Sequence, residues 1–234
     1  MPVTDTGGRT GYVFDNDNAH SGGQHRFLAS AHDPMTTARL AETGVGAGWR
    51  CLEVGAGGGS VAVWLAGRVA PTGSVLATDV KPQRIPRRPG LTVVRHDVTS
   101  DPLPESEFDL VVARLVLRHL PQRLEVLDRL VRALKPGGRL QIDEFDTSYE
   151  PPLVTPDERS RRVYEDFIAA KDAVMRAAGV DPAFGRTSPR RCATQGWPTS
   201  TRDRSSSSGA PDRRTWSNWS TTRSTSGTRW SRRA

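Results

Sequence analysis

Short apolar runs alternate with amphipathic, helix-compatible stretches through the middle of the chain. The apolar runs predict buried strands at 51–54, 74–79, 91–96, 108–116 and 141–146. Between and after them, residues 61–69, 122–134 and 155–179 carry small or apolar side chains at helical spacing. Strands that alternate with helices in this rhythm predict an α/β fold with a doubly wound, mostly parallel sheet, which binds ligands at the carboxyl ends of its strands.

The first predicted strand runs directly into a glycine-rich turn, in the sequence RCLEVGAGGGS at 50–60. Gly55, Gly57 and Gly59 allow the backbone to turn sharply and to approach a ligand that a side chain would block. The helix that follows directs its free amide groups at the same place, which favours an anionic ligand group. The dinucleotide pattern G-x-G-x-x-G fits imperfectly, because Ser60 stands where the third glycine belongs. An NAD-dependent oxidoreductase is therefore disfavoured.

The spacing E-x-G-x-G-x-G from Glu53 to Gly59 resembles motif I of the class I S-adenosylmethionine-dependent methyltransferases, of the small-molecule type. The resemblance implies a Rossmann-like methyltransferase fold with S-adenosylmethionine as cofactor. It also implies that the loop wraps the amino-acid end of the cofactor, while Glu53 helps to hold the loop and the amino group. The alternative is a glycine turn that binds nothing, and the motifs that follow weigh against it.

Acids at the ends of the next two strands extend the predicted cofactor site. Asp79 lies 20 residues beyond Gly59, the offset at which a carboxylate accepts hydrogen bonds from both ribose hydroxyls. An ordinary cap of the following turn is the alternative for Asp79. Asp97 and Val98 resemble the family's adenine position, where Asp97 would accept from the exocyclic amine and Val98 would lie near the ring face.

Two further motifs resemble the same family. Phe108-Asp109, followed by Leu117, His119 and Leu120-Pro121, resembles motif IV, and LKPGGRL at 134–140 marks the fifth strand. Arg114 occupies a position that faces cofactor or substrate in the family, so it joins the predicted cofactor-binding residues. The chain lacks the Asn/Asp-Pro-Pro-Tyr signature of amino-group methylation in nucleic acids and proteins, which disfavours a base-modifying enzyme.

The catalytic group stays open. Asp143 and Glu144 lie near the end of the fifth strand and are candidates for a base, with a solvated strand end as the alternative. His119 has a suitable pKa but matches a packing position. Because methyl transfer from a sulfonium is intrinsically downhill, positioning alone can suffice. The stretch 19–43 is helix-compatible, with Asp33-Pro34 as a start signal for MTTARLAETG. The resemblance implies that N-terminal helices cover the cofactor, with a helix that only caps the sheet edge as the alternative. It also implies that the helix at 155–179 roofs the substrate pocket.

The formal net charge of +7 is confined to the last fifth of the chain. Residues 187–234 contain ten Arg, no Lys and two acids, or +8, which leaves −1 for the rest. The same segment has no Leu, Ile, Val or Phe and four of the six Trp. We therefore expect a disordered tail and a sheet without the C-terminal edge hairpin. One hypothesis is a frameshift near Arg186, and an alternative function is nucleic-acid binding through the basic, Trp-containing tail.

The sequence thus predicts an N-terminal cap segment at 1–32, a methyltransferase domain at 33–186 and a tail at 187–234. Two cysteines, Cys51 and Cys192, provide neither a disulfide framework nor a metal cluster. No apolar run approaches a membrane span and no export signal is present, so a soluble cytoplasmic protein is expected. The expected function is methyl transfer to a small-molecule substrate. Nucleic-acid partners are disfavoured, and the oligomeric state and the acceptor stay open.

Overall fold

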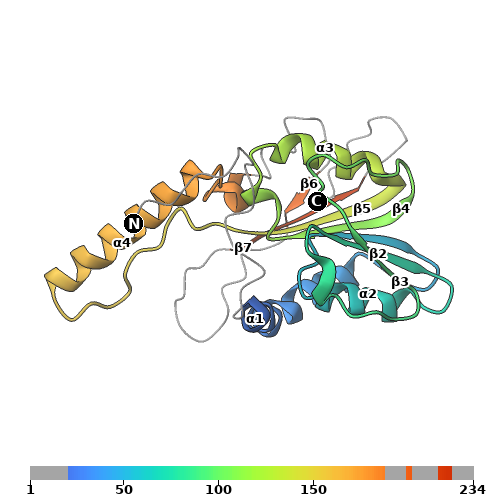
Figure 1. The fold of residues 1–234 in the computed structure, drawn as a ribbon, viewed down its shortest axis with the longest axis horizontal. Helices are drawn as coiled ribbons and strands as arrows, with labels where there is room; N and C mark the ends of the chain where they lie inside the picture. Colours follow the sequence, from blue (N-terminus) through green and yellow to red (C-terminus); the bar gives the residue numbers. More distant parts are fainter. Residues whose placement is uncertain (1–20, 188–198, 202–215, 223–234) are drawn as a thin grey trace, which may run out of the picture.

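A seven-stranded sheet in the order β3-β2-β1-β4-β5-β7-β6 forms the centre of the computed structural model (Figure 1). The structure describes residues 21–187, 199–201 and 216–222. Strands β1 to β5 pair in parallel, which confirms the predicted doubly wound sheet. The strands are β1 (Arg50–Val54), β2 (Ser74–Asp79), β3 (Leu91–Arg95), β4 (Phe108–Arg114), β5 (Leu134–Phe145), β6 (Thr199–Thr201) and β7 (Trp216–Thr222).

Helices cover both faces of the sheet. Helices α1 (Ser21–Glu42) and α2 (Ser60–Val69) lie on one face and α3 (Arg123–Ala133) on the other (Figure 1). Two 3-10 turns, η1 (Pro82–Arg84) and η2 (Leu117–His119), follow β2 and β4. Helix α4 (Glu158–Ala177) extends away from the sheet (Figure 1). It has no buried residue. The expectation that it roofs the substrate pocket stays a prediction.

Helix α1 matches the stretch 19–43 that the sequence marked as helix-compatible. It runs without a break through Asp33-Pro34, the expected start signal inside that stretch, and it crosses the expected boundary at 32–33. Pro34 removes one amide donor from the helix interior, which normally favours a helix start there. The amide that Pro34 lacks would have bonded the Ser30 carbonyl one turn earlier. The Thr37 hydroxyl donates to the Asp33 carbonyl at 2.7 Å in the turn that follows.

The apolar run of strand β4 contributes side chains to two hydrophobic cores. Val111 and Ala113 belong to the core under α3, whereas Leu110 and Val112 belong to the core under α2. Successive side chains of a strand point to opposite faces, so a strand covered on both sides must be apolar throughout. The continuous run at 108–116 predicted this arrangement, although β4 ends at Arg114 because Leu115 turns to φ 57°.

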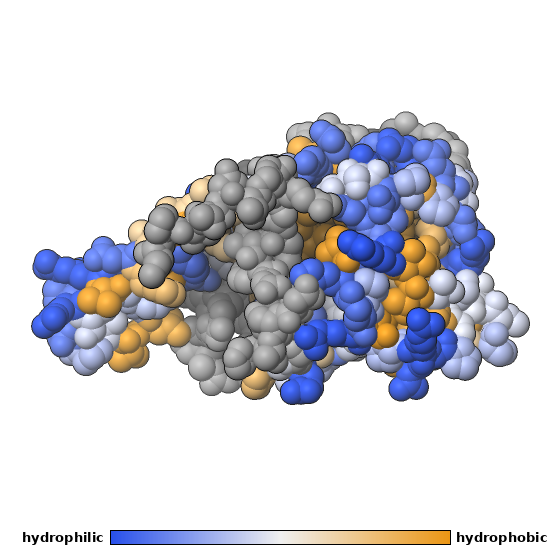
Figure 2. Space-filling model, viewed as in Figure 1, coloured by the Kyte–Doolittle hydropathy of each residue, from blue (hydrophilic) through white to orange (hydrophobic). Residues whose placement is uncertain are grey.

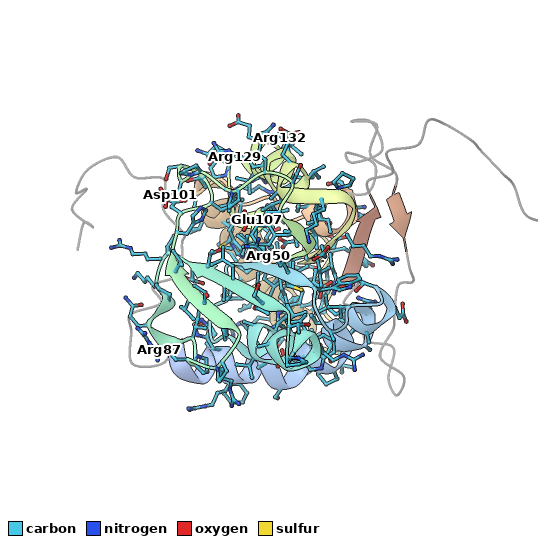
Figure 3. The ribbon with its side chains drawn as sticks, turned by 90° about the vertical axis from the view of Figure 1, so that its right-hand side faces the viewer. Arg50, Arg87, Asp101, Glu107, Arg129 and Arg132 are labelled. Carbon is cyan, nitrogen blue, oxygen red and sulfur yellow. The ribbon has the colours of Figure 1, made fainter. Side chains whose placement is uncertain are left out.

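Ion pairs line the amino ends of the central strands. Arg50 at the start of β1 pairs with Glu107, which precedes β4 (Figure 3). Asp109 accepts from the Arg50 amide at 2.7 Å and pairs with Lys135 at 2.8 Å. This edge of the sheet is therefore held by charge-assisted contacts, and the opposite edge is left for ligands.

No helix among the described residues is long and apolar enough to cross a membrane.

The sheet has the edge hairpin that the sequence analysis expected to be lost. Strand β7 pairs antiparallel with β5, with Ile142 opposite Trp219, and β6 pairs antiparallel with β7. The expectation of a sheet without this hairpin is therefore wrong. The expected disorder of 187–234 stays a prediction. Ladder hydrogen bonds need backbone groups, not Leu or Val, and Thr and Trp are themselves favoured in strands. The remainder of the tail lies outside the described residues.

The frameshift hypothesis stays a prediction. We expect resequencing of the locus to reveal a shifted frame near Arg186, because the composition changes abruptly there and the upstream body is nearly neutral. In the corrected frame, apolar residues should occupy the strands that pair beyond β5. An uninterrupted frame whose codon usage continues unchanged into 187–234 would contradict the hypothesis.

Candidate functional site

A cavity of about 650 Å³ opens at the carboxyl ends of the parallel strands. Its walls come from the ends of β1, β2 and β4, the turn after β3 and the amino half of α1. This is where ligands bind in doubly wound sheets. Seven of the eight predicted cofactor-binding residues line the cavity, namely Glu53, Gly55, Gly57, Asp79, Asp97, Val98 and Arg114. Residues up to 96 positions apart in the chain, from Gln24 to Leu120, thus meet in one place.

The three glycines of the loop have different roles. Gly55 has φ 66°, and a Cβ there would lie 2.4 Å from Cγ2 of Val116 in the cavity wall. Gly57 has φ 56° and lies under the His25 ring. Gly59 does not line the cavity: its Cβ would meet Ile85 at 2.8 Å, so it allows η1 to pack on the loop. The prediction that Gly59 contacts the cofactor is therefore replaced by a packing role.

Asp79 ties the loop to the end of β2. Its Oδ2 accepts from the Gly57 amide at 2.9 Å, and its Oδ1 accepts from the Lys81 amide at 2.8 Å. The two alternatives for Asp79 are thus compatible, because the carboxylate caps the turn and also lines the cavity. A carboxylate oxygen has two lone pairs, and each oxygen of Asp79 uses one of them in these bonds. Each oxygen can therefore still accept a hydrogen bond from a ribose hydroxyl.

Glu53 is a buried acid on the cavity wall. Only 2% of its surface is exposed, and its Oε2 has no hydrogen-bond partner among the described residues. Burial raises the pKa of Glu53 to about 8, against the opposing effect of the Arg114 charge. A buried acceptor without a partner is costly, so this oxygen suits a cationic donor supplied by a ligand.

The predicted adenine position lies at the other end of the cavity. Asp97 Oδ1 accepts from the amide of Thr99 at 2.9 Å and from its hydroxyl at 2.6 Å, which fixes the carboxylate. Val98 is almost fully buried, and its carbonyl accepts from Arg129 at 3.2 Å. The side chains of Val116 and Leu120 complete an apolar wall. A flat aromatic ring with an exocyclic amine fits this pairing of acid and apolar surface.

Arg114 fastens α1 across the mouth of the cavity. Its Nη1 lies 2.6 Å from Asp33 Oδ1, and the Ser60 hydroxyl donates to the same oxygen at 3.1 Å. Farther along α1, the Thr36 hydroxyl donates to Asp143 at 2.7 Å. The side chains of Arg114 and Asp33 are only 14% and 27% exposed, so their attraction is less screened than that of a surface pair.

We expect Asp33→Asn to loosen α1. The variant removes the charge that pairs with Arg114, so amides of α1 should exchange hydrogen faster and S-adenosylhomocysteine should bind about tenfold more weakly, the effect of one charge-assisted hydrogen bond. Hydrogen-exchange mass spectrometry and calorimetry measure the two effects. Ser30→Ala, on an exposed position of the same helix, is the control. Unchanged exchange over 21–42 would show that the pair does not hold the helix.

None of the three catalytic candidates lines the cavity among the described residues. Asp143 is held by Thr36 and Gln141, and burial raises its pKa. Glu144 Oε1 accepts from three consecutive amides, of Val116, Leu117 and Arg118, at 3.0, 2.7 and 3.3 Å. Burial lowers the pKa of His119 to about 4. The geometry assigns Asp143 and Glu144 to fixing α1 and the turn after β4, not to contact with a ligand.

The cavity also contains residues that sequence reasoning missed. Helix α1 contributes a group that includes Gln24, His25, Leu28 and Ala29, while Arg84 and His96 come from the turns after β2 and β3. Burial and the Arg84 charge lower the pKa of His25. The positions 25, 28 and 29 share one helical face. No signal in the sequence indicated which face of α1 meets the sheet.

Comparison with known proteins agrees with this geometry. A family model described as a methyltransferase domain matches residues 52–142. Methyltransferase str3 of Strobilurus tenacellus is 32% identical over 170 residues, which cover 70% of this chain and 57% of that protein. The ubiquinone/menaquinone biosynthesis C-methyltransferase UbiE of Laribacter hongkongensis is 31% identical over 163 residues, 63% of this chain and 64% of that protein. Residues 52–142 thus form a methyltransferase domain, and the chain is similar to methyltransferases over about two thirds of its length.

Solved structures share the fold of this chain. An S-adenosylmethionine-dependent methyltransferase from Mesorhizobium loti superposes with a TM-score of 0.56 at 21% identity, covering 76% of this chain and 92% of that one. Phosphoethanolamine N-methyltransferase 2 of Haemonchus contortus, solved with S-adenosyl-L-methionine, gives 0.60 at 15% identity, over 82% of this chain and 52% of that one. The chain spans between about half and two thirds of the curated relatives it matches.

The cavity residues fit S-adenosylmethionine, the molecule with which phosphoethanolamine N-methyltransferase 2 was solved. The unpartnered Oε2 of Glu53 suits the ammonium group, and the space above Gly55 and Gly57 admits a ligand where a Cβ would intrude. Asp79 suits the ribose hydroxyls, and Asp97 with Val98 suits the adenine. These individual contacts are proposals that rest on placement and chemistry.

We expect cofactor binding to release a proton from Glu53. With a pKa of about 8, this acid is mostly protonated at pH 6.5 in the ligand-free protein, and an ammonium group beside it favours the carboxylate. Affinity for S-adenosylhomocysteine should therefore rise with pH up to about 8. Calorimetry at pH 6.5 in buffers of different ionisation enthalpy should show about one proton released, and Glu53→Gln should abolish the release. Equal proton release by the two proteins would contradict this assignment.

Proposed function

We propose that this methyltransferase transfers a methyl group to a small-molecule acceptor bound beside the cofactor in the cavity. The observation that carries the proposal is the convergence of Glu53, Asp79 and Asp97 on one cavity of about 650 Å³. That volume lies within the range of small-molecule sites. When bound, S-adenosylmethionine supplies an electrophilic methyl group on a sulfonium.

The chain's own residues bind and orient the cofactor and the acceptor. The glycine loop and Asp79 hold the cofactor's position, and α1, fastened by Asp33 and Arg114, limits the access of water. Glu53 and Glu144, whose pKa values burial raises to about 8 and about 7, are engaged in binding and in fixing the turn after β4. Catalysis by proximity and alignment of acceptor and methyl group therefore suits this site better than a dedicated base.

The apolar part of the cavity favours an acceptor with an apolar surface. Leu28, Leu115, Val116 and Leu120 line the cavity together. UbiE, one of the relatives, is named for C-methylation in ubiquinone and menaquinone biosynthesis. A phenolic or quinone-like ring is consequently the first acceptor class to assay. Whether carbon, oxygen or nitrogen receives the methyl group depends on that acceptor.

Calorimetry of the full chain tests the cofactor half of the proposal. We expect S-adenosylmethionine and S-adenosylhomocysteine to bind with one site per chain, while NAD does not bind. Methyl transfer from radiolabelled cofactor to a panel of small phenols tests the acceptor half. A folded sample that binds NAD in preference to S-adenosylhomocysteine would overturn the proposal. Cofactor binding with labelling of nucleic acid alone would overturn only the acceptor class.

No specific observation among the described residues favours the alternative of nucleic-acid binding through the tail. Most of 187–234 lies outside the described residues, and the described parts are β6 and β7, which extend the sheet.

A further inference from the structure

Helix α4 exposes large apolar side chains. Val163, Phe167 and Val174 are 62%, 62% and 64% exposed, and Ala170 between them is exposed as well. The helix projects from the body of the protein (Figure 1), and apolar side chains gather on this projecting part (Figure 2). Its carboxyl end is anchored, because Val180 and Phe184 just beyond it are buried in the body. An exposed apolar surface of this kind normally marks a site of interaction with another molecule.

The spacing of these four residues indicates what kind of partner. Positions 163, 167, 170 and 174 are separated by four, three and four residues, which is the a/d seam of a heptad repeat. A seam this narrow packs against one other helix. Membrane-surface helices instead have a broad apolar face and a mainly basic polar face. Helix α4 contains five basic and four acidic residues, so its polar surface has no strong preference for anionic lipid.

We propose that α4 is the interface of a homodimer, in which the α4 helices of two copies pack antiparallel along this seam. With the two-fold axis midway between Phe167 and Ala170, each Phe167 packs on Ala170 of the second copy. Each Val163 then lies against Val174 of the second copy. The large Phe167 side chain thus meets the small Ala170 side chain. The same residues contribute from both copies, as an isologous interface requires.

Charge and shape agree with the antiparallel arrangement. Asp166 flanks the seam on one side and Lys171 on the other, and in this register Asp166 lies beside Ala173 of the second copy and Lys171 beside Tyr164. No like charges face each other. Because each body sits at the carboxyl end of its own α4, antiparallel packing places the two bodies about 30 Å apart at opposite ends, whereas parallel packing would bring them together.

Sedimentation equilibrium of the full chain tests the proposal. We expect a reversible dimer with twice the monomer mass of 25.6 kDa. Phe167→Glu should remove the dimer while calorimetric binding of S-adenosylhomocysteine stays unchanged, which shows that the variant is folded. Ala169→Glu, which introduces the same residue on another exposed face of α4, is the matched control and should remain dimeric.

A residue exchange tests the register. Phe167→Ala leaves two small residues in contact and Ala170→Phe opposes two large ones, so each single variant should weaken the dimer at least tenfold. The double variant restores the large-to-small contacts and should recover most of the association. A monomer at all concentrations, a dimer that survives Phe167→Glu, or a monomer that instead binds phosphatidylcholine vesicles through α4 would each overturn the proposal.

Discussion

Replacement of Asp79 by Asn is expected to lower the affinity for S-adenosylhomocysteine about 100-fold or more. The change removes a charged acceptor that lies on the cavity wall and also bonds the Gly57 amide at 2.9 Å. Each hydrogen bond to a charged group contributes about 1.5–3 kcal/mol. Loss of charge assistance to two ribose hydroxyls therefore corresponds to about 3 kcal/mol or more, at 1.4 kcal/mol per tenfold change.

The matched control for Asp79→Asn is Asp109→Asn. Asp109 also accepts a backbone amide, that of Arg50, but it lies at the amino ends of the strands and pairs with Lys135. Its replacement should lower the thermal midpoint and leave the affinity per folded molecule unchanged. Calorimetry measures the affinity and circular dichroism the folded fraction. Equal losses of affinity in the two variants would mean that Asp79 acts only through stability.

The central sheet could be predicted because its signals are local and dense. The apolar run at 108–116 required cover on both faces, and the neighbours Val111 and Val112 indeed enter different cores. The carboxyl ends of neighbouring parallel strands meet at one edge, which is why Glu53, Asp79 and Asp97 could be placed together from the sequence. Chain order and residue type were sufficient for this part of the site.

The missed features depend on long-range packing. Nothing local to α1 shows that Asp33 pairs with Arg114, 81 positions away, or that His25 lies over Gly57. The edge hairpin was missed because apolar content was the criterion, whereas β7 joins β5 through backbone pairing. Gly59 matched a motif, but its left-handed backbone serves contact with Ile85. A glycine motif thus identifies positions where a side chain must be absent. It does not show whether a ligand or another part of the protein occupies the space beside the glycine.

Replacement of Gly55 by Ala is expected to be the most damaging change in the loop. Gly55 has φ 66°, where a Cβ costs about 1–2 kcal/mol. The new methyl would also lie 2.4 Å from Val116 Cγ2, and such overpacking costs about 1–3 kcal/mol more. Val116 cannot retreat freely, because its amide donates to buried Glu144 at 3.0 Å. We expect urea unfolding to show a loss of about 2–5 kcal/mol.

The opposite result is expected for Gly67→Ala, which makes the same chemical change inside α2. Gly67 is exposed, has no left-handed backbone, and its added Cβ would meet nothing within 4 Å. Alanine in a helix interior is favoured over glycine by about 0.5–1 kcal/mol, so this variant should be more stable than the parent. Because Val116 lines the cavity, Gly55→Ala should also weaken S-adenosylhomocysteine binding, whereas Gly67→Ala should not. Stability changes of the same sign in both variants would show that the loop conformation of Gly55 is not what the protein requires.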